Sequence, residues 1–568
     1  MDLAKYLFTR LGQIGVRSVH GVPSDYNLRA LDYLKSCNLH WVGNANELCS
    51  GYAADGYARV KGVGALISSF GPGELSAINA IAGAYSEKIP VVHIVGTPPL
   101  KAQRAGACLH HSLGDGNFGV FADMFKNITA AKVNLIDAAT APQMIDSALR
   151  ECILKSQPVY ISLPTDMVSA QVPAPEHPID LSPPIYEASS ESAVVDQVFS
   201  RIESCRRPLI LVDGFTARYG VLDELDQLVR ATGFTTLTTP FGKSIVDETI
   251  RNFCGVYLGS AGDLALQSWI HDCDLVLYFG PEPSDGNTFG FSAVPNPDVT
   301  ITFEGNSTRI GAVETPCSVK SILTKLLARL DKSSITTKEG YQHRPSEAPR
   351  AVDRDRIIDH ASFWPYISRF IRSEDVLLTE PGTATYGSPA LTLPPSTKLI
   401  NSSRWLSIGH MLAASQGAAL AQRDIAEVDG RPPGRTILFE GDGSLQMTAQ
   451  AISDIIRNKL DVIIFLLNNN GYTTERVIHG FSESYNDIQP WRNLQAANYF
   501  GADLDDASYA VRTFSAANWG ELQDALNHAG LQAGNGLNIV EIAMDMGDVP
   551  EALQRLAHYV SKRNSGDK

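Results

Sequence analysis

The sequence of 568 residues has little of several features that define large classes of protein. Charged residues make up 19% of it and hydrophobic residues 44%, which excludes a disordered chain, because disorder needs low hydrophobicity and high charge density. Basic residues are scarce: the chain has 47 Lys and Arg but 62 Asp and Glu. We therefore expect no basic surface that could bind nucleic acid. The longest apolar runs, such as Val462–Leu467, are too short to span a bilayer, so we expect no membrane partner.

Paired cysteines are also absent. The eight cysteines include no C-x-x-C pair and none lies beyond Cys317, which disfavours a disulfide framework or zinc site and predicts buried, reduced thiols. The first residues lack a long apolar segment, so we expect no secretory signal and a cytoplasmic enzyme. An NAD-binding dehydrogenase is disfavoured, because no G-x-G-x-x-G follows a predicted strand with an acidic residue about 20 positions on.

Short runs rich in Val and Ile alternate with helical stretches along the whole chain. Continuous apolar strands suit parallel sheets buried on both faces, and the alternation predicts repeated βαβ units. Residues 169–190 and 331–355 are polar and read as linkers. We therefore predict an α/β chain of three doubly wound parallel-sheet domains, 1–170, 190–330 and 356–568. The predicted strands are Gly64–Ser69, Val91–Gly96, Val159–Leu163, Leu209–Asp213, Leu275–Phe279, Val299–Phe303, Val376–Thr379, Thr436–Glu440, Val462–Leu467 and Asn538–Ala543.

Two polar motifs follow neighbouring strands of the third block. Residues 441–444 read GDGS and residues 468–471 read NNNG. Parallel strands place their carboxyl ends at one edge of a sheet, so Asp442 and the asparagines should lie close together. A carboxylate, an amide oxygen and a loop carbonyl suit Mg²⁺, while glycine N–H groups and the Ser444 hydroxyl suit phosphate. The alternative is a pair of tight turns, which GDG alone would favour but the two motifs together do not.

In the first block, Glu47 opens a predicted helix and His110 and His111 adjoin each other. Each alone would be a helix-dipole glutamate or a surface histidine pair. Together with the third-block motifs, however, several stretches resemble the pyruvate decarboxylase branch of the thiamine diphosphate-dependent enzymes. These stretches are HGVPSDYNL, NANELCSGYAADGYAR, GELSAINAIAGAYSEKIPVVHIVG, LHHSLGDGNF, GYTTERVIHG and YNDIQPW, and the resemblance covers nearly the whole chain.

This resemblance implies non-oxidative decarboxylation of a 2-oxo acid with thiamine diphosphate and Mg²⁺. It implies a homodimer or homotetramer whose active sites lie between subunits. The implied metal ligands are Asp442, Asn469 and the carbonyl of Gly471. The implied catalytic residues are Asp25, Glu47, His110, His111 and Glu475; Glu475 also reads as a helix start, which is compatible. The implied cofactor-binding residues are Glu47, Thr383, Leu406, Ile408, Asp442, Gly443, Ser444, Asn469, Gly471 and Glu475.

Several positions depart from the family pattern. Pro381 replaces a Thr, Leu406 a Gly, and Thr474 an Ile, while Gly286 stands where the family often places an aromatic residue. With Ile478, the positions Gly286, Pro381 and Thr474 form the predicted substrate pocket. We expect Gly286 and Thr474 to open it, so that a 2-oxo acid larger than pyruvate fits better.

Two alternative functions come from other classes of protein. The changes at Pro381 and Leu406 make a carboligase that forms acyloins from a 2-oxo acid and an aldehyde an alternative. A non-catalytic paralogue is disfavoured, because the implied catalytic residues are intact. Phe215 aligns with the cysteine that mediates substrate activation in yeast-type enzymes, so thiol-mediated activation should be absent.

Overall fold

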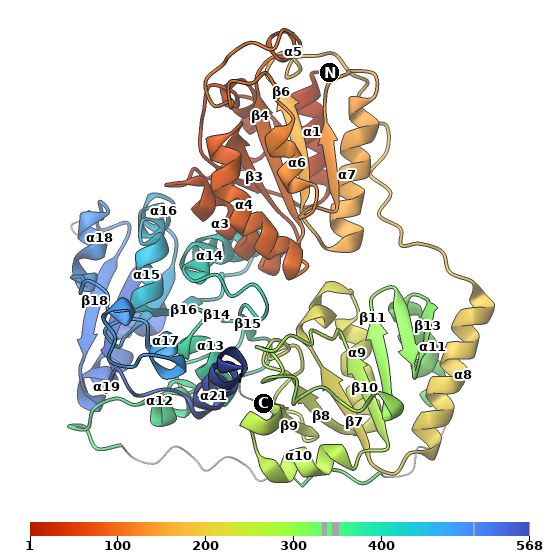
Figure 1. The fold of residues 1–568 in the computed structure, drawn as a ribbon, viewed down its shortest axis with the longest axis vertical. Coiled ribbons are helices and arrows are strands. Elements are labelled where there is room, and N and C mark those ends of the chain that lie inside the picture. The colour runs from red at the N-terminus through yellow and green to blue at the C-terminus, as the bar shows by residue number, and fades with distance from the viewer. Residues whose placement is uncertain (332–337, 343–351, 504–505, 567–568) are drawn as a thin grey trace.

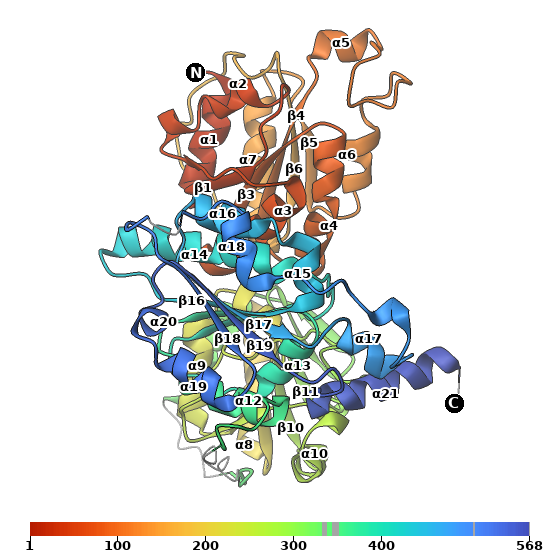
Figure 2. The ribbon, with the colours of Figure 1, turned by 90° about the vertical axis from the view of Figure 1, so that its left-hand side faces the viewer.

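The computed structural model describes residues 1–331, 338–342, 352–503 and 506–566. These residues form three sheets, which we call the first, central and third sheets. The first sheet lies at one end of the molecule, and the central and third sheets lie beside each other at the other end (Figures 1 and 2). Each of the ten predicted strands occurs, with its ends displaced by at most one residue.

The first sheet has six parallel strands in the order β2-β1-β3-β4-β6-β5. Neighbouring residues of a strand face opposite sides. In β4, Val92 and Ile94 join one apolar cluster, whereas Val91 and Val95 join another. Both faces are therefore buried under helices, as the apolar runs predict. The elements are α1 Leu3–Gln13, β1 Ser18–Gly21, α2 Leu28–Leu31, β2 His40–Trp41, α3 Glu47–Lys61, β3 Gly64–Ser69, α4 Pro72–Ser86, β4 Val91–Thr97, α5 Leu100–Arg104, α6 Val120–Phe125, β5 Ala131–Asn134, α7 Ala141–Lys155 and β6 Val159–Pro164.

The central sheet has seven strands in the order β13-β12-β11-β10-β7-β8-β9. Its strands are parallel except that β12 runs antiparallel to β11 and to β13, an addition that the apolar runs did not predict. The elements are α8 Ala188–Ser204, β7 Pro208–Val212, α9 Leu222–Thr232, β8 Thr235–Thr238, β9 Phe253–Val256, α10 Leu264–His271, β10 Leu275–Phe279, β11 Thr300–Glu304, β12 Ser307–Ile310, β13 Val313–Pro316 and α11 Val319–Leu330.

The third sheet has six parallel strands in the order β15-β14-β16-β17-β19-β18. The elements are α12 His360–Ile367, β14 Val376–Thr379, α13 Thr383–Gly387, β15 Lys398–Ile400, α14 His410–Asp429, β16 Thr436–Gly441, α15 Asp442–Thr448, α16 Ala451–Arg457, β17 Val462–Asn468, α17 Thr473–Ile478, α18 Ala496–Tyr499, β18 Val511–Ala516, α19 Trp519–Asn527, α20 Ala529–Ala533, β19 Leu537–Ala543 and α21 Glu551–Ser565.

Helices α3 and α14 join the first and third sheets. They pack at backbone distance: a Cβ at Gly56 would lie 2.1 Å from the carbonyl oxygen of Ala414, and one at Gly417 would lie 1.8 Å from that of Ala53. The buried Tyr57 hydroxyl also donates to Asp424 at 2.7 Å. These contacts fix the orientation of the first sheet on the third.

Candidate active site

The GDGS and NNNG motifs meet at one edge of the third sheet, as predicted. Strands β16 and β17 are paired in parallel, with Gly441 opposite Leu467, so both motifs follow at the same edge. The Gly471 N–H donates to Asp442 at 3.0 Å, as does the Gly443 N–H. Glycine is required at 471, where φ is +130° and a Cβ would lie 2.5 Å from a backbone oxygen. The local sequence thus places the Asp442 carboxylate against the loop after β17.

Three oxygen atoms converge at this edge when the Asn469 amide lies with its oxygen inward, and the Thr473 hydroxyl lies 3.2 Å from the same amide. The Asn469 side-chain oxygen lies 3.1 Å from Asp442 Oδ1 and 3.0 Å from the carbonyl oxygen of Gly471. Turning the amide over would let its nitrogen donate to both, which is the arrangement that satisfies hydrogen bonds without a cation. A carboxylate, an amide and a carbonyl oxygen are donors that a hard cation such as Mg²⁺ prefers. The residues present therefore fit such an ion.

Asp442 is also electrostatically suited to a cation. Its side chain is buried, with the residue 6% exposed. Burial raises the pKa of Asp442 to about 6, and backbone hydrogen bonds, the first from Gly471, lower it by less. A bound cation would favour the charged carboxylate in this position.

A cavity of about 280 Å³ opens beside the three oxygens. It brings together every residue of the third block that was predicted for the cofactor, metal or substrate, together with Gly286 from the loop after β10. These residues are Gly286, Pro381, Thr383, Leu406, Ile408, Asp442, Gly443, Ser444, Asn469, Gly471, Thr474, Glu475 and Ile478.

Helix α21 supplies a wall of this cavity that the sequence analysis missed. It lines the cavity through four apolar side chains, and its Arg563 pairs with Asp285 of the same cavity wall at 2.6 Å. The spacing of these side chains is that of one helix face, which is the signal that could have revealed a buried stripe. The four residues are Leu553, Leu556, Ala557 and Val560.

The predicted acid and base groups of the first block gather at the carboxyl edge of the first sheet. His110 Nε2 lies 2.8 Å from Asp25 Oδ2, and the His110 ring stacks on Tyr26 with ring centres 4.9 Å apart. His111 joins them, with its nearest ring nitrogen within 4.8 Å of the ligand atoms of the other two. The hydrogen bonds from His110 and Ser24 lower the pKa of Asp25 despite partial burial. This cluster can pass protons between a carboxylate and an imidazole.

Glu47 lies at the same edge, at the first turn of α3. Asn46 caps this helix by accepting from the Cys49 N–H at 2.7 Å. The Glu47 carboxylate lies over the start of α4, where a Cβ at Gly73 would be 2.8 Å from it. Glycine at 73 therefore makes room for the Glu47 side chain.

The predicted site residues thus form two groups within one chain. Among the described residues, none from 1–170 lines the cavity of the third sheet. Asp25, Glu47, His110 and His111 form one group and the cavity residues, Glu475 included, form the other. Phe215 belongs to neither: it is buried in the central block, where the Lys88 ammonium lies 4.4 Å from its ring centre.

Three models of one known protein family match successive parts of the chain. Residues 1–117 match the thiamine pyrophosphate enzyme N-terminal TPP binding domain. Residues 195–330 match the central domain and residues 382–542 the C-terminal TPP binding domain of the same family. The chain therefore belongs to the thiamine pyrophosphate enzymes.

Relatives narrow the class. The chain is 44% identical to a pyruvate decarboxylase of Aspergillus parasiticus over 566 residues, covering 98% of this chain and 97% of the relative. It is 36% identical to pyruvate decarboxylase isozyme 1 of Saccharomyces cerevisiae, covering 100% and 99%. A 4-hydroxybenzoylformate decarboxylase of Rhodococcus jostii has the same fold, with a TM-score of 0.75 at 19% identity over 96% of this chain and 99% of that one. Within the family, the chain is a thiamine diphosphate-dependent 2-oxo acid decarboxylase related to the fungal pyruvate decarboxylases.

No helix in the described parts of the chain has both the length and the apolar character needed to cross a membrane.

Proposed function

We propose that the protein converts a 2-oxo acid to an aldehyde and CO₂ without oxidation, using thiamine diphosphate and Mg²⁺. The observation that carries this proposal is a single cavity in which a three-oxygen cluster adjoins an apolar pocket. Asp442, Asn469 and the Gly471 carbonyl would hold the metal ion, while the Gly443 N–H and the Ser444 hydroxyl would bind diphosphate oxygens. When bound, thiamine diphosphate supplies a nucleophilic carbon and a ring that takes up the electron pair left on the substrate when CO₂ departs.

The remaining residues of the cavity would position the cofactor and the substrate. Thr383, Leu406 and Ile408 line the cavity and would contact the cofactor between its diphosphate and the substrate, Leu406 through its carbonyl. Thr474 and Ile478, both on α17, face the same cavity and would contact the substrate side chain. Glu475, on the same helix, would hold a proton beside the reacting carboxylate.

We further propose that the active site is completed by a second copy of the chain, in a homodimer or homotetramer. Glu47 would donate a hydrogen bond to the cofactor's aminopyrimidine ring, and Asp25, His110 and His111 would transfer protons. The cavity that would hold the cofactor contains none of these four among its lining residues. An Asp25–His110 pair left open to water would also interact weakly, because solvent screens exposed charges. A partner's cavity placed over this edge would bring the two groups together.

The substrate is proposed to be pyruvate or a larger 2-oxo acid. The carboligase remains a second candidate, because Pro381 and Leu406, the positions that motivate it, both line the cavity. We also propose domain boundaries at 1–170, 190–330 and 356–568, since the three family matches fall inside these ranges. A cytoplasmic location is supported by eight unpaired cysteines.

Product identification tests the reaction. The full chain is supplied with thiamine diphosphate, Mg²⁺ and a series of 2-oxo acids, with and without an aldehyde acceptor. Aldehyde and CO₂ in equal amounts are expected without the acceptor. Acyloin as the main product with the acceptor would favour the carboligase, and absence of CO₂ from every 2-oxo acid would overturn the proposal.

A further inference from the structure

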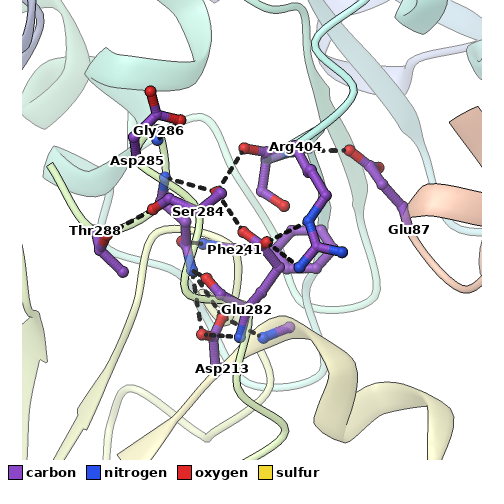
Figure 3. Close-up of polar contacts among 12 residues, drawn as sticks. Glu87, Asp213, Phe241, Glu282, Ser284, Asp285, Gly286, Thr288 and Arg404 are labelled. Atoms are coloured by element: carbon purple, nitrogen blue, oxygen red, sulfur yellow. Dashed lines mark hydrogen bonds and ion pairs between the residues drawn. The ribbon is translucent and has the colours of Figure 1, made fainter. Parts of the chain in front are cut away.

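Two loops from different sheets form one wall of the cavity. Residues 282–288 follow β10 of the central sheet, and residues 402–409 precede α14 of the third block. The Ser284 hydroxyl lies 3.1 Å from the Ser403 carbonyl oxygen, and Arg404 forms an ion pair with the buried Glu282 at 2.6 Å (Figure 3). The two loops are therefore tied directly to each other.

Each loop is also anchored from behind. The buried Asp213 carboxylate accepts the Glu282 N–H at 2.7 Å and the Asn287 side-chain amide at 3.1 Å (Figure 3). The buried Glu87 carboxylate, which comes from the first block, accepts the Arg404 N–H at 3.2 Å (Figure 3). It also accepts the N–H groups of the residues on either side of Arg404. Both loops thus have fixed positions at the cavity.

Gly286 and Leu406 face each other across this wall. A Cβ at Gly286 would lie 3.6 Å from Leu406 Cδ1, 3.5 Å from the Tyr386 hydroxyl and 3.1 Å from the Ser403 carbonyl oxygen. Among the glycines of the described chain, Gly286 is not one with a positive φ, so its backbone does not call for glycine. The space that a side chain would occupy there is already bordered by Leu406.

Leu406 has the opposite character. Its φ is +52°, in the left-handed region that favours glycine and that a branched, bulky residue adopts only when its surroundings hold it there. The chain therefore has a leucine where the backbone favours glycine, and a glycine where the backbone accepts a side chain. Backbone strain of this kind is typical of functional sites.

We propose that Leu406 is a specificity-determining residue that fills the recess beside Gly286 and so limits the substrate to 2-oxo acids with short aliphatic side chains. This proposal rests on the proposed function and revises one of its expectations. Gly286 would open the pocket only as far as Leu406, whose Cδ1 lies 3.6 Å from the position of a Cβ at residue 286. The pocket wall at this point is the leucine, and its size decides which substrate side chains are accepted.

Substrate selectivity tests the proposal. The kcat/KM ratio of benzoylformate to 2-oxobutanoate is measured for the holoenzyme and for Leu406→Ala and Leu406→Gly. Both variants should raise the ratio about tenfold or more, the scale on which hydrophobic pockets discriminate. The swap Gly286→Leu with Leu406→Gly returns a leucine to the wall and should restore the original ratio. Ratios within about twofold of wild type in both single variants overturn the proposal.

Thermal unfolding of the chain without cofactor gives a second measurement. Gly286→Leu should lower the unfolding temperature, because its side chain meets Leu406, and the swap should recover most of the loss. Additive effects of the two substitutions on the unfolding temperature would contradict the contact between residues 286 and 406.

Phe291→Gly is the matched control for the kinetic experiment. Phe291 is exposed, has a φ of +67° and does not line the cavity, so its replacement should leave the substrate ratio unchanged. If the wild type decarboxylates no 2-oxo acid, the proposed function fails, while the unfolding cycle still decides the pairing.

Discussion

The carboxyl edges of the first and third sheets hold polar groups in opposite surroundings. The side chains of Asp25 and His110 are 53% and 58% exposed, whereas Asp442 and Asn469 are 6% and 4% exposed. The cavity at the third-sheet edge is lined by residues of the same chain, including residues of α21. Proton transfer and charge stabilisation both gain from the exclusion of water. The comparison indicates that the third sheet supplies the binding cavity. The first sheet supplies proton-transfer groups that are still exposed to solvent in the single chain.

Glu47→Gln should have the largest effect of these substitutions. It should lower the turnover rate without lowering the affinity for the cofactor. Glutamine keeps the shape but cannot exchange a proton, so kcat should fall about 10³-fold, within the range of general acid–base catalysis. Thiamine diphosphate affinity, measured by isothermal titration, should change little, because the three-oxygen cluster is intact. Glu151→Gln on α7 is the control, with its carboxylate in a surface pair with Lys155. A large loss of cofactor affinity in Glu47→Gln would contradict the division between chemistry and binding.

Asp442→Asn should instead weaken the binding of Mg²⁺ and thiamine diphosphate. Replacing the carboxylate removes the charge that a cation needs in the cluster, and the apparent affinity for Mg²⁺ and thiamine diphosphate should fall about 10²-fold. Raising both concentrations should recover much of the activity, which it cannot do for Glu47→Gln. Asp429→Asn, at the exposed end of α14, serves as the control. Equal cofactor affinity in Asp442→Asn and wild type would show that the ion binds elsewhere.

Mixing the two variants tests whether the edges meet between subunits. If Glu47 of one chain serves the Asp442 cavity of another, a mixed dimer contains one site with both native residues. Co-expression of Glu47→Gln and Asp442→Asn should then restore about a quarter of wild-type activity, because half of randomly formed dimers are mixed and half of their sites are intact. Activity no higher than the average of the two separate variants would place both residues in one chain's site.

Strand length decided how much of the fold was predictable. Apart from β18, every strand that the sequence analysis missed has four residues or fewer, and such short runs carry too little periodicity to stand out. β18 is an edge strand that mixes polar and apolar residues, so it lacks the continuous apolar run of β17. The antiparallel strands β12 and β13 were missed because they have only four residues each.

The candidate site was predictable where a motif carried it. The GDGS and NNNG loops could be placed together because parallel strands share an edge. The apolar stripe of α21 could not be assigned to the cavity, because a stripe shows that a helix is buried but not against what. The contact of Leu406 with Gly286 joins loops 120 positions apart in different blocks, and only their three-dimensional arrangement reveals it.

Asp213→Asn in the central block should have the smallest effect of these substitutions. The effect should appear in how the stability of the protein depends on pH. Like Asp442, Asp213 is buried, but its donors include the side-chain hydroxyls of Thr239 at 2.5 Å and Tyr278 at 2.8 Å. Asp442 instead accepts from backbone N–H groups and lies beside the oxygens of the proposed metal site. Burial raises the pKa of Asp213 to about 6, and the hydrogen bonds to Asp213 lower it by less. The native state therefore holds a proton between about pH 4 and 6 that the unfolded chain has released, so this contribution to stability falls as pH rises through that window.

The difference in unfolding temperature between wild type and Asp213→Asn should accordingly shrink by a few degrees from pH 4.5 to pH 6.5 and stay level above it. Asp506 provides the control, because its pKa is lowered to about 2 by hydrogen bonds from Ser508 and Lys459. Its contribution is lost only as pH falls below about 4, so Asp506→Asn should show a constant difference across the window. A constant difference for Asp213→Asn as well would mean that its ring of donors keeps the carboxylate ionised throughout. Both carboxylates would then be buried and ionised. They would differ in whether hydrogen bonds from the chain itself are enough to stabilise the charge.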